Sequence, residues 1–96
     1  MDFNENNATE AVLNSFSKIK DERLKKIMSS IIRNLHQVVK EVEPTEEEWI
    51  KAIMFLTKTG QKCDDRRQEF ILLSDVLGVS MLLDSINNRK SKNETE

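Results

Sequence analysis

Apolar side chains recur at spacings of three and four residues between positions 24 and 42, and this pattern predicts one long amphipathic helix. Asp21 has the side chain of a helix N-cap, and Pro44 keeps the helix from continuing. The predicted helix spans residues 21–43, roughly 33 Å at the usual rise per residue. Its apolar stripe consists of Leu24, Ile27, Met28, Ile31, Leu35, Val38, Val39 and Val42, widened by Ile32.

This stripe has a nearly heptad spacing, so it can pack inside its own domain, against a second copy of the chain, or both. A chain of 96 residues has room for a single domain, and its other apolar segments are short. We therefore expect part of the stripe to reach a partner subunit or an apolar ligand.

Helices are also predicted on both sides of the long one. A short first helix begins after Asn7 or Thr9. Thr45 and Glu48 have the spacing of a capping box, which predicts another helix start. We expect that helix to end at Gly60, where a residue without a side chain permits a left-handed turn.

A fourth helix is predicted after Asp64 or Asp65, either of which can act as its N-cap. Residues 70–77 are so densely apolar that we expect this helix to be central, and Gly78 to end it. Ser80 then caps a last helix, which stops at Asn87-Asn88. The folded part is predicted over residues 8–88, with disordered polar tails at residues 1–7 and 89–96.

The composition also favours an all-α fold, a small bundle of about five helices. Gly is 2, Pro is 1 and Tyr is 0, too few turn and aromatic residues for a β-sandwich or barrel. One Cys and one His exclude an internal disulfide and a multi-thiolate or His-rich metal site. The net charge of -2 is spread along the chain, so we expect no nucleic-acid partner. No signal pattern or membrane span is apparent, and we expect a cytoplasmic protein.

No residue combination has the spacing of a catalytic site. His36 lies mid-helix beside the apolar stripe and is typical of a half-buried or surface histidine. Cys63 has no second thiol near it and is expected to be unreactive. Asp75 is different, because it stands among leucines and valines, where a carboxylate either faces water or serves a ligand.

Several motifs carry a resemblance to a known family: the run from Pro44 to Trp49, the segments Phe55-Leu56-Thr57 and Thr59-Gly60-Gln61, and the long stretch from Cys63 to Met81. Together they resemble the N-terminal helical domain of the intradiol ring-cleaving dioxygenases, most of all the hydroxyquinol 1,2-dioxygenases. The resemblance covers nearly all of residues 10–90.

The resemblance implies a fold and an activity that reach beyond these residues. Enzymes of this family cleave catechol-type rings with O₂ and a ferric ion held by two tyrosines and two histidines. Those ligands lie in a C-terminal β-sandwich domain, which is absent from this chain, as are its tyrosines. We therefore expect no iron and no ring cleavage from the chain by itself.

The resemblance further implies that this domain forms a homodimer interface, holds a phospholipid or fatty acid in an apolar tunnel there, and covers one side of the catalytic pocket. Leu72 and Asp75 match positions that contribute to the substrate pocket. The residues that we expect to line the tunnel and the dimer interface are Ile31, Leu35, Val38, Val42, Trp49 and Ile53.

Two hypotheses of function follow. The chain is either the dimerisation and pocket-covering domain of a hydroxyquinol or catechol 1,2-dioxygenase, or a freestanding helical homodimer that binds a lipid or another protein. Both use the same helices, and the sequence of residues 1–96 does not separate them.

Overall fold

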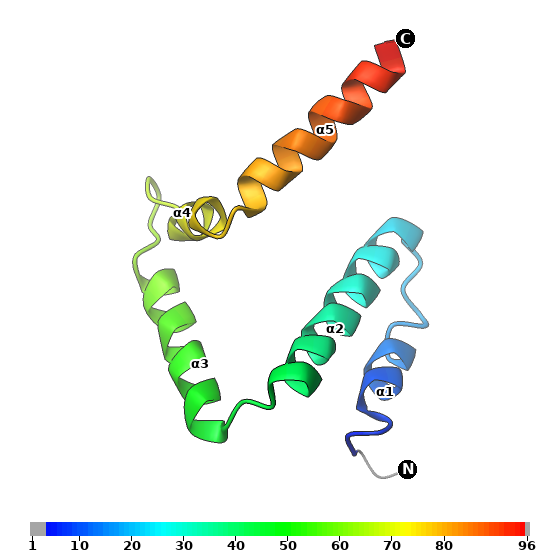
Figure 1. The fold of residues 1–96 in the computed structure, drawn as a ribbon, viewed down its shortest axis with the longest axis vertical. Coiled ribbons are helices and arrows are strands. Elements are labelled where there is room, and N and C mark those ends of the chain that lie inside the picture. Colours follow the sequence, from blue (N-terminus) through cyan, green and yellow to red (C-terminus); the bar gives the residue numbers. More distant parts are fainter. Residues whose placement is uncertain (1–3, 96) are drawn as a thin grey trace. The chain divides into compact units, whose positions relative to one another are not determined.

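The computed structural model describes residues 4–95, and the side chains of residues 4–91. The described chain consists of helices joined by turns and short connectors, without a strand (Figure 1). This confirms the all-α prediction. The five helices are α1 (Ala8–Asn14), α2 (Glu22–Val42), α3 (Glu46–Gln61), α4 (Glu69–Val76) and α5 (Val79–Thr95).

The chain divides into two compact units, Met1–Thr45 and Glu46–Glu96. The first unit holds α1 and α2, and the second holds α3, α4 and α5.

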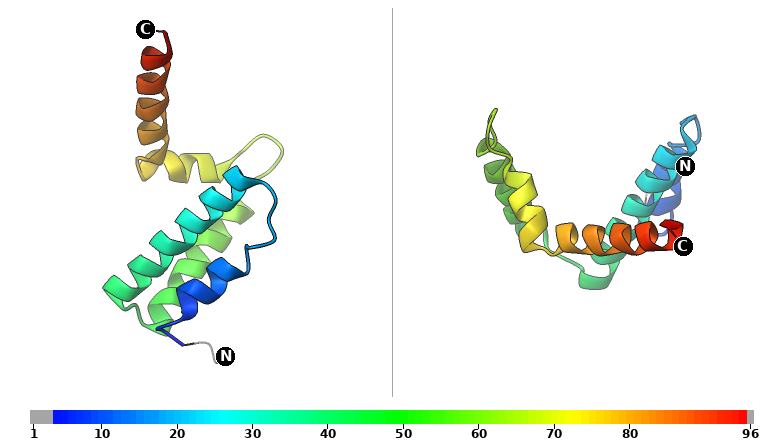
Figure 2. Two further views of the ribbon diagram at one scale, coloured as in Figure 1. Left: turned by 90° about the vertical axis from the view of Figure 1, so that its right-hand side faces the viewer. Right: turned by 90° about the horizontal axis from the view of Figure 1, so that it is seen from above.

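In the first unit, α1 runs beside α2, as all three views show (Figure 2). The start of α2 agrees with the prediction, because the Asp21 carboxylate accepts a hydrogen bond from the amide of Leu24 at 3.0 Å. Its end also agrees, since Glu43 has a left-handed backbone (φ 51°) directly before Pro44.

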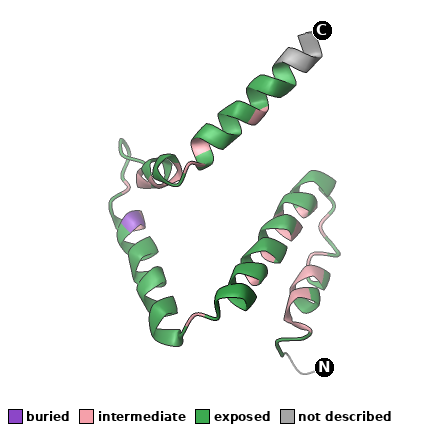
Figure 3. Ribbon diagram, in the orientation of Figure 1, coloured by how far each residue is buried: buried purple, intermediate pink, exposed green. Residues whose placement is uncertain are grey.

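The contact between α1 and α2 covers only one side of α2. Met28, Ile32 and His36 are half-buried there, while Ile31 and Leu35 on the neighbouring side are exposed. Figure 3 shows the half-buried positions of α2 on the side that faces α1. The apolar stripe predicted from the sequence is therefore left mainly uncovered by α1.

A side-chain hydrogen bond joins the two helices of the first unit. The hydroxyl of Thr9 lies 2.8 Å from Nδ1 of His36. The sequence left a half-buried or a surface position open for His36; the side chain is half-buried and ties α1 to the middle of α2.

In the second unit, α4 contacts both α3 and α5. It is not buried, which corrects the prediction of a central helix: Phe70 is 44% exposed and Val76 is 75% exposed. Among the side chains that the structure describes, Thr59 of α3 alone is buried (Figure 3). The apolar surface of α4 has too few neighbours within residues 46–96 to be covered.

Four predicted helix boundaries in the second unit are wrong. Gly60 lies inside α3 and does not end it. The N-cap of α4 is Gln68, because Asp64 uses its carboxylate in the turn before the helix. Ser80 lies inside α5, which continues through Asn87-Asn88 to Thr95.

Gly78 behaves as predicted, ending α4 with a left-handed backbone at φ 78°. Leu77 and Gly78 are the two residues between α4 and α5. At the other end of the chain, Asn4 to Asn7 form a turn in which the Asn4 side chain accepts hydrogen bonds from the amides of Asn6 and Asn7. The disorder predicted for residues 1–3 and 96 lies outside the described residues.

The two glycines predict opposite effects of the same substitution. Gly60→Ala should raise the free energy of unfolding by about 0.5–1 kcal/mol, because a helical glycine gains from the change and the new Cβ meets only the Phe70 ring at 3.8 Å. Gly78→Ala should lower it by about 1–2 kcal/mol, because the residue has a left-handed backbone although space is open around it. Denaturant unfolding followed by circular dichroism measures the free energy of unfolding of both variants. Equal effects of the two substitutions would contradict the assignment of a helical backbone to Gly60 and a left-handed backbone to Gly78.

Candidate functional site

An open pocket of about 350 Å³ lies between α3 and α4 in the second unit. On each helix its lining residues follow the spacing of a single helical face, starting at Phe55 on α3 and at Glu69 on α4. The lining residues are Phe55, Lys58, Thr59, Lys62, Glu69, Leu72, Leu73 and Val76.

The walls of this pocket are mainly apolar, and two of its polar groups are already engaged. The Thr59 hydroxyl donates a hydrogen bond to the Phe55 carbonyl at 2.9 Å. Glu69 binds Arg67, with Oε2 2.7 Å from Nε. The pocket is therefore suited to an apolar or aromatic group.

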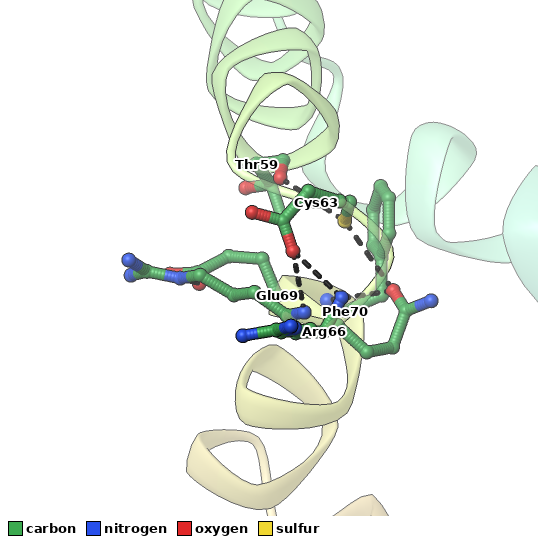
Figure 4. A network of polar contacts seen from close by, with 8 residues as sticks. Thr59, Cys63, Arg66, Glu69 and Phe70 are labelled. Carbon is green, nitrogen blue, oxygen red and sulfur yellow. Dashed lines mark hydrogen bonds and ion pairs between the residues drawn. The ribbon is translucent and has the colours of Figure 1, made fainter.

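A network of polar contacts holds the connector between α3 and α4 (Figure 4). One carboxylate oxygen of Asp64 accepts hydrogen bonds from the amides of Arg66 and Arg67, each at 2.8 Å. The amide of Asp64 in turn donates to the Arg67 carbonyl at 2.9 Å. These bonds close a tight turn immediately before α4 and explain why Asp64 is not its N-cap.

Electrostatics in the connector follow from the same contacts. The two amide hydrogen bonds, first that of Arg66 and then that of Arg67, lower the pKa of Asp64 below its ordinary value. The hydrogen bond with Arg67 lowers the pKa of Glu69 and raises that of Arg67. All three groups are held in their charged forms.

Cys63 is a half-buried free thiol at the end of α3. Its Sγ lies 3.6 Å from the Thr59 carbonyl and 3.3 Å from Oε1 of Gln68, the α4 N-cap. The Gln68 oxygen also accepts a hydrogen bond from the amide of Phe70 at 3.4 Å. The thiol thus links the end of α3 to the start of α4, which is a structural role.

The two residues expected in a substrate pocket are both on α4, but only one of them lines the pocket between α3 and α4. Leu72 lines the pocket between α3 and α4 and is still 52% exposed. Asp75 is exposed and is not among the residues that line it.

The six residues expected at a tunnel and dimer interface all have exposed side chains. Four lie on α2 and two on α3, each within its own unit. Their exposed fractions are 52% for Ile31, 51% for Leu35, 54% for Val38, 65% for Val42, 51% for Trp49 and 40% for Ile53.

Sequence reasoning did not identify the pocket between α3 and α4. The signal was present, since Phe55, Thr59 and Lys62 are spaced by four and three, as are Glu69, Leu73 and Val76 in the next helix. What could not be read from the sequence is that the connector folds these two faces onto each other.

Ferric iron does not fit the donor atoms of this chain. The sequence has one His and no Tyr. Within the described residues, no three His, Cys, Asp or Glu side chains lie close enough together to hold a metal ion. None of the described helices is both long enough and apolar enough to cross a membrane.

Comparison with known proteins gives the family. The sequence model of the family described as "Catechol dioxygenase N terminus" matches residues 21–95. The chain belongs to this family.

The relatives of this chain are longer proteins, named as dioxygenases. It is 54% identical over 94 residues to the hydroxyquinol 1,2-dioxygenase of Rhizobium sp. (strain MTP-10005), covering 98% of this chain and 32% of the relative. It is 48% identical over 95 residues to the 6-chlorohydroxyquinol 1,2-dioxygenase of Cupriavidus pinatubonensis, covering 99% of this chain and 34% of the relative. The chain thus spans about a third of the length of these curated relatives.

A solved structure agrees with the fold. The crystal structure of hydroxyquinol 1,2-dioxygenase from Pseudomonas putida DLL-E4 superposes with a TM-score of 0.85 at 56% identity, covering 88% of this chain and 30% of that one. The match lies well above the level at which only a fold is shared.

The Asp64 turn predicts an acid-sensitive connector. Because the folded pKa of Asp64 is lowered, the turn is stabilised above the ordinary value of 3.8 and loses that stabilisation as the pH falls through the folded pKa. The protection of the Arg66 and Arg67 amides against hydrogen exchange, relative to their intrinsic rates at each pH, should therefore fall in that acid range, and Asp64→Ala should lower it at every pH.

Asp64→Asn is the matched control, because an amide oxygen still accepts a hydrogen bond but does not titrate. Its amides should show intermediate protection without the acid transition. An acid transition that persists unchanged in Asp64→Asn would show that another group controls the turn.

Proposed function

We propose that this chain is the N-terminal dimerisation and pocket-covering domain of a cytoplasmic hydroxyquinol 1,2-dioxygenase that cleaves trihydroxylated aromatic rings. The observation that carries the proposal is the 54% identity to a hydroxyquinol 1,2-dioxygenase across 98% of the chain. The exposed apolar faces of α2, α3 and α4 support it, because a domain that works by covering other surfaces must present such faces.

The catalytic iron of the proposed enzyme would be held by residues outside this chain. The family resemblance implies two tyrosines and two histidines as ligands, and the donor set here does not supply them. The chain's contribution would be to exclude water from one side of the pocket and to select the substrate.

Leu72 and Asp75 are the residues that we propose for substrate selection. They are three positions apart on α4, so their side chains project from neighbouring sides of the helix. A ring placed against Leu72 would bring a third hydroxyl within reach of the Asp75 carboxylate, which would accept its proton in a charge-assisted hydrogen bond.

Asp75→Asn in a complete enzyme tests this role. Residues 1–96 are joined to the catalytic domain of the Rhizobium relative, and kcat/KM is measured for hydroxyquinol and catechol. The variant should raise the barrier for hydroxyquinol by about 1–3 kcal/mol, the range for a lost hydrogen bond to a charged group, and leave catechol nearly unchanged.

Equal changes for the two substrates would show that Asp75 does not select between them. An exposed aspartate on the last helix, Asp84, provides the control: Asp84→Asn should alter neither value. A wild-type fusion without ring-cleaving activity would count against the proposed function itself.

The proposed homodimer pairs through the exposed stripe of α2, with a phospholipid or fatty acid in an apolar tunnel beside it. Ile31, Leu35, Val38 and Val42 are spaced by four, three and four residues, the pattern of helices that pack along a shared seam. Their exposure in the single chain supports this, since α1 covers a different side of α2.

Leu35→Glu should convert the dimer to a monomer. The substitution removes about 1.5–3 kcal/mol of side-chain burial per protomer and places a charge in an apolar seam. Gln37→Glu, an exposed change outside the stripe, should leave the dimer intact. Sedimentation velocity at tens of micromolar measures both, and a monomeric wild type would contradict the proposed interface.

The freestanding homodimer remains the second candidate, and the same exposed stripe favours it. Native mass spectrometry of the wild-type chain would detect a co-purifying lipid. A lipid-loaded dimer formed by residues 1–96, together with an inactive fusion, would favour the freestanding protein.

A further inference from the structure

We infer that Ser74 and Ser80 are positioning residues, whose shared hydrogen bond sets the direction in which α4 presents Leu72 and Asp75 and so tunes substrate selection. This inference rests on the proposed function, because it concerns how the selecting residues are held. Neither serine is proposed to touch the substrate.

The hydrogen bond crosses the junction of two helices. The hydroxyl of Ser74, in the last turns of α4, lies 2.8 Å from the hydroxyl of Ser80, in the first turn of α5. Both serines are half-buried, whereas most of their neighbours are exposed. A hydrogen bond shielded from water in this way resists replacement by bulk solvent better than an exposed one.

The backbone at the junction depends on the same geometry. Gly78 has a left-handed backbone with φ 78°, and its amide donates to the carbonyl of Asp75 at 3.1 Å. The amide of Leu82 then donates to the Gly78 carbonyl at 3.1 Å, which begins α5. Asp75 therefore follows Ser74 directly and its own carbonyl takes part in the turn, so a change in the direction of this end of α4 moves Asp75 with it.

Apolar packing covers this junction only in part. Leu77 is 67% exposed, Val76 is 75% exposed and Met81 is 72% exposed, although α4 and α5 are in contact. A glycine hinge that is only partly packed permits several helix directions. The hydroxyl pair restricts the choice, which is why its loss should be felt at Asp75, the residue next to Ser74.

The alternative is that the two serines at the helix junction hydrogen-bond each other without any effect on function. In that case, removing the bond changes only the stability, and kcat/KM changes equally for every substrate. A positioning role predicts a change that depends on the substrate, because only a ring with a third hydroxyl uses the carboxylate whose direction is altered.

The test uses the same complete fusion enzyme and the variants Ser74→Ala, Ser80→Ala and the double variant. Each should lower kcat/KM for hydroxyquinol by about two- to tenfold, the range for a net hydrogen bond, with less than about a twofold change for catechol. The double variant should be no worse than either single variant, because both remove the same bond. Ser80→Thr keeps the hydroxyl and should restore most of the selectivity.

Ser85→Ala is the matched control, since Ser85 is an exposed serine on the same helix. Ser85→Ala should change kcat/KM for neither hydroxyquinol nor catechol. Hydrogen exchange of the Gly78 and Leu82 amides provides a readout that does not depend on catalysis: it should quicken in the Ser74 and Ser80 variants and not in Ser85→Ala.

Unchanged exchange at the junction, or equal losses for both substrates, would overturn the inference while leaving the role of Asp75 intact. A non-selective effect of Asp75→Asn would overturn the proposed role of Asp75, and the effect of the serines on selectivity would fall with it. The serine variants therefore test the positioning role, and Asp75→Asn tests the proposed role of Asp75.

Discussion

The apolar surface of this chain exceeds what the chain can bury, and most of its properties depend on that imbalance. α1 half-covers one side of α2 at Met28 and Ile32, while Ile31 and Leu35 stay about half exposed. A Leu or Ile gains about 1.5–3 kcal/mol on full burial, so the uncovered faces hold much of the stabilisation available to these helices. To gain that stabilisation, each uncovered face would have to pack against a surface from outside its own unit.

No apolar side chain among residues 4–91 is buried, so short polar contacts at the helix ends contribute much of what fixes the geometry of the helices. Asp21 caps α2, and Asp64 closes the turn before α4. The hydroxyls of Ser74 and Ser80 form a hydrogen bond at the junction of α4 and α5. Such bonds are worth about 0.5–1.5 kcal/mol each, less than a packed core, but they are directional. They define how each apolar face is presented before any partner covers it.

The sequence predicted the helices well where a local rule decides. The stripe, Asp21 and Pro44 define α2 almost to the residue, and the left-handed Gly78 follows from the same reasoning. The errors occur where a local signal had two uses. Asp64 can cap a helix or close a turn, and Gly60 can end a helix or lie within its last turn. Burial could not be predicted, because it depends on which helices lie against each face and not on the spacing of apolar residues along one helix.

The position of Asp75 connects these points. In the chain by itself the carboxylate is exposed and water solvates it, so it costs nothing among the leucines of α4. If a second domain covers α4, as we propose, the carboxylate loses that water and needs a donor. A ring bearing a third hydroxyl would supply one, whereas catechol would leave the charge unpaired. The selectivity proposed for Asp75 would thus follow from covering the part of α4 that carries this acid, and it would require the junction beside Asp75 to hold the carboxylate in one direction.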